Sequence, residues 1–143
     1  MTRWLTGLLT IASVGICFVG CGDEADLKSY SEPLRVAERT ALYLQGLRDK
    51  NLPRADFVAS RDITFSESRA LIDITLPSAI STGVKDAALK NQLTGKVEEL
   101  QRVFQDQVVS AVSGESIERD KASSGCDRCL AIVAEIRKLL GGK

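Results

Sequence analysis

Residues 89–111 read LKNQLTGKVEELQRVFQDQVVSA, and they carry the clearest structural pattern in the sequence. Its apolar residues recur at intervals of three and four, the spacing that gathers side chains on one face of an α-helix. They are Leu89, Leu93, Val97, Leu100, Phe104, Val108 and Ala111. We predict one long helix over residues 82–112, with this face packed against the rest of a small domain. A coiled-coil or partner-binding face is the alternative, although the stripe lacks several strict heptads in succession.

Two further segments show the same helical spacing. Ser31-Glu32-Pro33 has the residue types that start a helix, and we predict a helix over 32–49 that ends before Asn51-Leu52-Pro53. The last predicted helix covers residues 126–140, and its apolar stripe is Leu130, Val133, Ile136 and Leu140. Residues 114–125 contain Ser, Gly and alternating charges, which predicts an exposed linker before this helix.

The pattern between residues 61 and 76 is ambiguous. Ile63 and Phe65 alternate with polar residues, and so do Ile72, Ile74 and Leu76. This alternation favours a β-hairpin, and a short helix is the alternative. The predicted fold is therefore mainly α, a single domain over 31–143 with about three helices and one hairpin near 61–76. An all-α bundle is the alternative fold.

The composition restricts the chemistry that the chain can perform. Its 143 residues carry 19 Lys and Arg against 19 Asp and Glu, so there is no basic excess to attract nucleic acid. There is no histidine, which excludes a Ser/His/Asp triad, a Cys/His pair and a c-type haem motif. No phosphate-binding loop or other catalytic motif is present, so we expect no cofactor and lean toward a non-enzymatic protein.

The N-terminal segment has the three zones of an export signal. Arg3 provides one positive charge, residues 4–19 are apolar and uncharged, and Gly20-Cys21 follows with small residues. Phe18-Val19-Gly20-Cys21 resembles the lipobox of bacterial lipoprotein precursors, apart from Phe18, where Leu is usual. Cys17 fits the pattern less well, because Ile16 before it is not small. An uncleaved membrane anchor is the alternative, but the apolar run is short for a span of about 20 residues.

The resemblance has several implications for the mature protein. It implies that residues 1–20 are a signal peptide, that Cys21 receives the lipid, and that cleavage makes Cys21 the first residue. By analogy with enteric bacteria, Gly22 after it is compatible with transfer to an outer membrane. Residues 21–30 would form a tether, in which the eight residues 22–29 reach at most about 28 Å. We therefore expect a protein of the bacterial cell envelope, held on a membrane through Cys21.

Cys126-Asp127-Arg128-Cys129 is the one motif that could carry chemistry. Outside the cytoplasm such a pair tends to oxidise, so we predict a disulfide between Cys126 and Cys129. A redox-active pair is the alternative, in which a helix N-terminus and Arg128 would lower the pKa of Cys126. Zinc binding is weakly supported, because two thiolates supply half of a zinc site and no histidine completes it. An unpaired or intermolecular state also remains open, and no metal site is predicted.

These observations lead to two hypotheses about function. The first is a membrane-anchored envelope lipoprotein that binds a protein partner or supports the envelope without catalysing a reaction. The second is a thiol-disulfide oxidoreductase or redox sensor that uses Cys126 and Cys129. The sequence does not indicate which protein the partner would be.

Overall fold

The computed structural model describes residues 30–49, 62–112 and 118–142, and the regular secondary structure within them is entirely helical. The first long helix of the bundle is α2 (Ser31–Asp49), and the last is α7 (Arg119–Leu139). The second is a continuous run of α3 (Ile63–Ala70), the π-helical turn η1 (Leu71–Thr75) and α4 (Leu76–Gly83). The third runs through α5 (Ala87–Val103), the π-helical turn η2 (Phe104–Val109) and α6 (Ser110–Val112).

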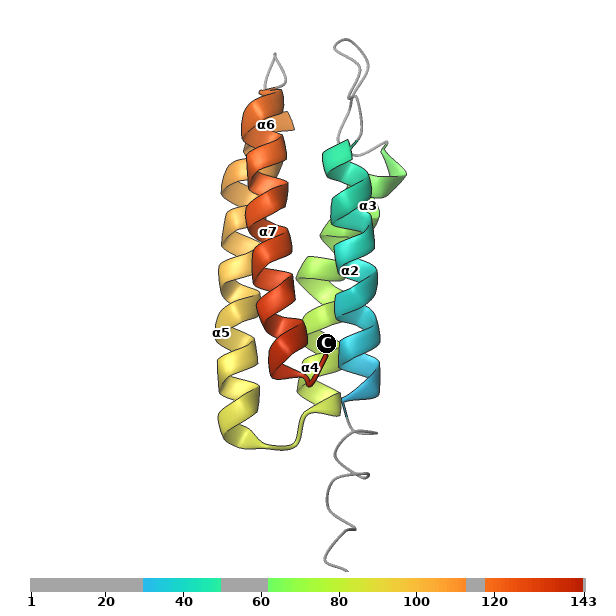
Figure 1. The fold of residues 1–143 in the computed structure, drawn as a ribbon, viewed down its shortest axis with the longest axis vertical. Helices are drawn as coiled ribbons and strands as arrows, with labels where there is room; N and C mark the ends of the chain where they lie inside the picture. The colour runs from blue at the N-terminus through green and yellow to red at the C-terminus, as the bar shows by residue number, and fades with distance from the viewer. Residues whose placement is uncertain (1–29, 50–61, 113–117, 143) are drawn as a thin grey trace, which may run out of the picture.

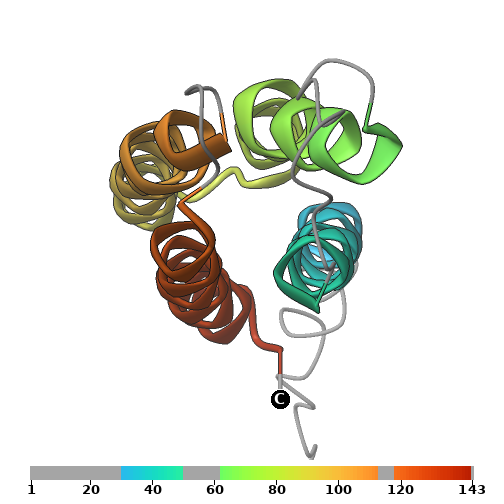
Figure 2. The ribbon, with the colours of Figure 1, turned by 90° about the horizontal axis from the view of Figure 1, so that it is seen from above.

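The four long helices form a bundle in which the chain runs alternately up and down (Figure 1). Seen along the bundle, they are arranged as a ring, and each packs against the helices before and after it in the sequence (Figure 2). Helix α7 closes the ring by packing against both α2 and the α5–η2 helix. The start of α2 and the end of α7 lie at the same end of the bundle (Figure 1). The predicted mainly-α class is confirmed, and the all-α bundle fits it.

The predicted hairpin at 61–76 is wrong, because this region is helical from Ile63 onward. The Asp62 side chain caps the helix by accepting a hydrogen bond from the Phe65 backbone N–H at 2.9 Å. Phe65, Ser68, Leu71 and Ile72 are buried at helical spacing. Ser68 is polar, but its hydroxyl donates to the Thr64 carbonyl one turn earlier at 2.8 Å. The helix therefore has both a start signal and an inward face.

The π-helical turn η1 explains how this helix continues through Pro77. A proline in a helix lacks the N–H donor, and its ring clashes with the preceding turn. The wider turn places the Leu76 N–H on the Leu71 carbonyl, five residues back, instead of on the Ile72 carbonyl. In this register the residue that would donate to the Ile72 carbonyl is Pro77, which has no N–H. The Ile72 carbonyl therefore lacks its helical backbone partner. The Gln101 side-chain amide of α5 donates to it at 3.3 Å.

Two predicted helix boundaries also differ from the structure. The helix predicted over 82–112 begins at Ala87, because the Asp86 carboxylate caps it by accepting from the Leu89 N–H at 2.7 Å. Helix α7 begins at Arg119, seven residues before the predicted start at residue 126. The predicted linker 114–125 is thus helical from Arg119, and Ala122 and Gly125 are buried on its inner face. Residues 113–117 lie outside the described part of the chain. The helix predicted over 32–49 is confirmed to within one residue.

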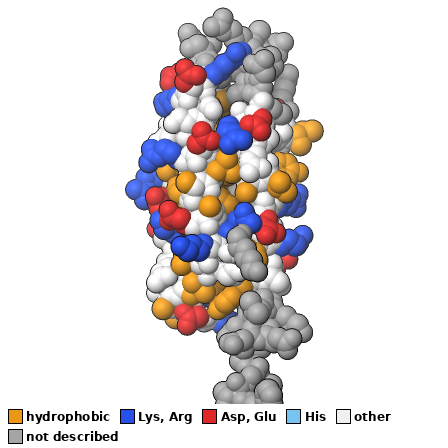
Figure 3. Space-filling view, in the orientation of Figure 1, with side chains coloured by type: hydrophobic (Ala, Val, Ile, Leu, Met, Phe, Trp, Pro, Cys, Tyr) orange, Lys and Arg blue, Asp and Glu red, His pale blue; other side chains and the backbone are white. Residues whose placement is uncertain are grey.

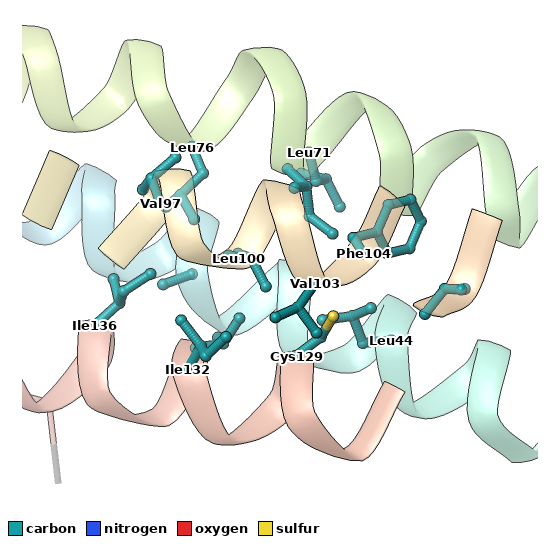
Figure 4. Close-up of a cluster of buried hydrophobic side chains, with 14 of the residues drawn as sticks. Leu44, Leu71, Leu76, Val97, Leu100, Val103, Phe104, Cys129, Ile132 and Ile136 are labelled. Carbon is teal, nitrogen blue, oxygen red and sulfur yellow. The ribbon is translucent and has the colours of Figure 1, made fainter. Parts of the chain in front are cut away.

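The core is aliphatic and runs the length of the bundle. Leu44, Leu71, Leu76, Leu100, Phe104 and Ile136 converge from all four helices (Figure 4). The Phe65 and Phe104 rings lie 5.7 Å apart and join the second helix to the third. Charged side chains of both signs are interspersed over the face seen in Figure 3. Among the described residues, no helix is apolar over a length that would cross a membrane.

Candidate functional site: two buried thiols in one helix

Cys126 and Cys129 lie one turn apart on the inner face of α7. They are 1% and 0% exposed, so both side chains belong to the core. In the view of Figure 4 the Cys129 sulfur points toward Val103 of α5 and lies beside Leu44 of α2. The structure therefore brings together the two residues that the sequence singled out, but it buries them.

The position of the pair within α7 changes its chemistry. The sequence pattern predicts the pair at a helix N-terminus, but the helix starts two turns earlier, at Arg119. The positive end of a helix dipole acts within the first turn, so it does not reach the thiol of Cys126. The expectation that the helix N-terminus activates Cys126 is wrong.

The predicted disulfide is not found, since both cysteines are free thiols in the structure. The helix geometry gives a physical reason. Residues three apart in an α-helix have Cβ atoms about 5–6 Å apart. A disulfide requires Cβ atoms about 3.5–4.5 Å apart. Closing the bridge would therefore tighten the helix in its middle, where the turn is held by hydrogen bonds on both sides.

The electrostatic environment keeps both thiols protonated at neutral pH. Burial, with a smaller contribution from the Asp127 carboxylate, raises the pKa of Cys126 from its ordinary value to about 11. Burial and the neighbouring Cys126 raise the pKa of Cys129 to about 12. The redox-active alternative required a lowered pKa at Cys126, and burial raises this pKa instead. Arg128 acts on Cys129 instead, and Arg48 of α2 acts on Cys126, each opposing part of the increase.

Gly125 allows α7 to approach the third helix beside the pair. A Cβ atom at this position would lie 2.8 Å from the Gln107 Cβ and 2.9 Å from the Val108 Cγ2, both in η2. These distances are too short for any side chain larger than hydrogen. The sequence pattern predicts Gly125 in a linker. Its small neighbour Ala122, three residues earlier, was the available signal that a helical face continues upstream.

A pocket of about 140 Å³ opens next to Cys126, between α2, the η2–α6 segment and the start of α7. Its apolar lining includes Leu47 and Val108, and its polar lining includes Arg48 and Ser123. The Arg48 guanidinium is held by Asp49 at 2.9 Å and by Asp127 at 3.3 Å. No pattern in the sequence indicated this pocket, because its walls come from three separate helices.

Other features of the described residues are less specific. A broad, shallow groove lies between α5 and α7, where Lys96 of α5 pairs with Glu135 of α7 at 2.6 Å. Within the described ranges, no group of three or more Cys, Asp and Glu side chains is arranged to hold a metal ion. The predicted lipidation residue Cys21, together with Gly22 and the signal segment, lies outside the residues that the structure describes.

Comparisons with protein-family models, with curated proteins and with solved structures find no match to this chain.

Proposed function

We propose that this protein is a lipid-anchored component of the bacterial cell envelope whose helical bundle serves as a non-enzymatic, protein-binding or structural module. The observation that carries this proposal is the sequence Phe18-Val19-Gly20-Cys21, directly after an uncharged apolar run and before the acidic stretch Gly22–Asp26. A single apolar chain holds a protein weakly on a bilayer, whereas the diacylglyceryl cysteine of such precursors provides two.

The state of the thiols favours a non-enzymatic role over thiol-disulfide exchange. The thiolate is the attacking species in exchange reactions, and exchange proteins lower the pKa of their leading cysteine. Here burial raises the pKa of Cys126 to about 11, and only 1% of the residue is exposed. A thiol that is both protonated and covered is a poor nucleophile at neutral pH.

The surface of the bundle carries exposed apolar residues to which a protein partner could bind. Leu42, Ile63 and Ile74 are large apolar residues that are 67%, 77% and 69% exposed. Ile63 and Ile74 belong to the second helix, and Leu42 belongs to α2, which packs against it. Single exposed apolar side chains are common in proteins and do not by themselves indicate a binding site. We therefore use these positions to place crosslinking probes.

The anchor is tested by the intact mass of the protein extracted from its native membrane. The expected product lacks residues 1–20 and carries added lipid mass on Cys21. In Cys21→Ser the precursor should remain unprocessed. The matched control is Cys17→Ser, which removes a nearby thiol and should be processed normally. A product that retains residues 1–20 with an unmodified Cys21 would refute the proposal.

The binding role is tested by photo-crosslinking in intact cells. A photoreactive amino acid at Ile63 or Ile74 should give one discrete crosslinked product that mass spectrometry identifies as an envelope protein. The same amino acid at Asp120, an exposed position at one end of α7, is the control for random encounter. Equal crosslinking from all three positions would count against a defined partner at this face.

A further inference from the structure

The buried thiol pair has a geometry that suits a bridging ion better than a disulfide. We propose that Cys126 and Cys129 bind one soft monovalent cation of the copper(I) class, in a two-coordinate thiolate site reached through the pocket beside Cys126. This site lies entirely within the described residues and does not depend on Cys21, so it can be tested separately from the proposed anchor.

The spacing of the two cysteines suits two bonds to one ion. Both face inward from consecutive turns of an unbroken helix, with Cβ atoms about 5–6 Å apart. Two metal–sulfur bonds, each about as long as the 2.3 Å of a zinc–thiolate bond, place the sulfurs about 4.6 Å apart when they lie in a straight line. This separation is close to the Cβ–Cβ distance, so the site requires rotation of the two side chains and no closer approach of the backbone. A disulfide requires the Cβ atoms themselves to approach more closely.

The type of ligand identifies the ion. Thiolates are soft ligands, which among the biological metals favour copper(I), zinc and iron–sulfur clusters. Zinc takes four ligands in structural sites, and the described residues contain no group of three or more ligand side chains. A cation that is satisfied by two sulfurs fits the pair, whereas zinc, magnesium and calcium do not.

Binding releases two protons and leaves a negative charge that burial disfavours and two nearby arginines partly offset. Each thiol loses its proton to solvent, the two S–H bonds are replaced by two S–metal bonds, and the oxidation state of the metal does not change. The resulting complex carries one negative charge. Two nearby guanidinium groups oppose that charge, because Arg48 acts on Cys126 and Arg128 acts on Cys129. Asp127 contributes the opposite effect on Cys126, although its carboxylate is itself 3.3 Å from Arg48.

The pocket supplies the path to the site. Cys126 lines it directly, and its volume of about 140 Å³ exceeds the roughly 30 Å³ that a water molecule occupies in the liquid. Its charged and polar lining residues are Arg48, Arg119, Asp120 and Ser123. An ion that enters would first exchange a ligand for the Cys126 sulfur, and it would then bind Cys129, which lies one turn farther along α7 and outside the lining.

The test uses the full chain carrying Cys17→Ser and Cys21→Ser, so that Cys126 and Cys129 are its only thiols. Copper(I) is titrated anaerobically against a coloured copper(I) chelator in mild detergent. We expect one ion per chain, a thiolate-to-copper absorption band in the near ultraviolet and unchanged helicity by circular dichroism. Because two protons are released, the apparent affinity should rise by up to about 100-fold per pH unit below the thiol pKa values.

Variants of the pair distinguish this site from unspecific thiol binding. Cys126→Ser and Cys129→Ser should each weaken binding more than about 100-fold, since each removes one of two direct ligands. The matched control, Cys126→Ser with Ser124→Cys, keeps two thiols on α7 but moves one to an exposed position. It should bind as weakly as the single variants.

The proposal would be overturned by control binding as tight as that of the original pair, by several ions per chain, or by loss of helicity on binding. Silver(I), which favours the same two-coordinate geometry, should compete with copper(I), whereas zinc should not. Displacement of copper(I) by stoichiometric zinc would also contradict a two-coordinate site.

Discussion

At the scale of single residues, Gly125 lies where a side chain would collide with the neighbouring helix. We expect Gly125→Ala to destabilise the bundle by about 1–3 kcal/mol, because the new methyl group would overlap Gln107 and Val108 across the helix interface. The measurement is urea unfolding followed by circular dichroism at the helical band. A variant as stable as the parent would mean that α7 and η2 are not in such close contact.

Gly95 provides the matched control for this substitution. It lies in α5, and a Cβ atom there would meet nothing within 4 Å. Gly95→Ala should therefore stabilise the protein by about 0.5–1 kcal/mol, since alanine has the higher helix propensity. The same change of residue is thus expected to have opposite signs at the two positions.

The buried thiols should make the stability of the protein depend on pH in the alkaline range. The folded protein holds the Cys126 proton more tightly than the unfolded chain, because its pKa rises from about 9 to about 11 on folding. This contribution is present below pH 9 and is lost as the pH rises toward 11. Each thiol should reduce the unfolding free energy by up to about 1.4 kcal/mol per pH unit in that window.

The measurement is the urea midpoint at pH 8 and at pH 10.5. Lysines and tyrosines also titrate in this range, so the double variant Cys126→Ala with Cys129→Ala is the reference. The fall in its midpoint should be smaller than in the parent. An equal fall in both proteins would show that the thiols are not responsible.

At the scale of secondary-structure elements, the contact between Gln101 and the Ile72 carbonyl is a consequence of Pro77. We expect Gln101→Ala to cost about 1 kcal/mol, because it leaves a partly buried carbonyl without a donor. In a Pro77→Ala background the cost should be smaller, since the new alanine has a backbone N–H that can bond to the Ile72 carbonyl. Urea unfolding of the four proteins gives this coupling energy directly. Equal costs in both backgrounds would mean that the stabilising effect of Gln101 does not depend on Pro77.

The same element shows where prediction from sequence succeeds and where it fails. The apolar faces of α2, α5 and the second half of α7 were predicted, because their spacing of three and four is maintained. The second helix was predicted as a hairpin, because Ile72, Ile74 and Leu76 alternate as they would in a strand. In the structure Ile72 and Leu76 are buried at the regular helical spacing of four, whereas Ile74 between them is 69% exposed. The exposed isoleucine completed an alternating pattern that is also typical of a strand, and the spacing alone does not distinguish the two.

The candidate site was only partly predictable for a related reason. The spacing of Cys126 and Cys129 identified the pair and placed it on one helix. Its protonated, buried state depends on where α7 begins, and the start signal was missed because Ser, Gly and charged residues are typical of a linker. The pocket depends on contacts between α2, α6 and α7, which no local pattern contains.

At the scale of the whole molecule, the proposed anchor implies an orientation on the membrane. The tether enters at the start of α2, where the α4–α5 connection also lies (Figure 1). Helix α2 has 19 residues and is about 28 Å long. The pocket end of the bundle therefore lies about 28 Å from the end at which the tether enters. A fluorophore at Lys85→Cys should be quenched more strongly by lipid-headgroup quenchers than one at Asp120→Cys.

This comparison uses the lipidated protein in vesicles, with the buried Cys126 and Cys129 replaced by alanine to avoid labelling them. Equal quenching at the two positions would mean that the bundle lies flat or tumbles freely on its tether. Stronger quenching at Asp120→Cys would place the pocket end at the bilayer.

The proximity of the two ends of the bundle has one more consequence. A Cβ atom at Gly142, just after α7, would lie 2.9 Å from the Leu34 Cδ1 near the start of α2. The end of α7 and the start of α2 therefore lie in close proximity, so a short linker could join them. A circular permutant that joins Gly142 to Ser31 through a short linker and opens between Ser113 and Ile117 would keep the four helices in the same order around the ring. Its new N-terminus would lie at the pocket end. A lipidation signal fused there would therefore anchor the bundle in the opposite orientation, with the pocket end nearest the membrane.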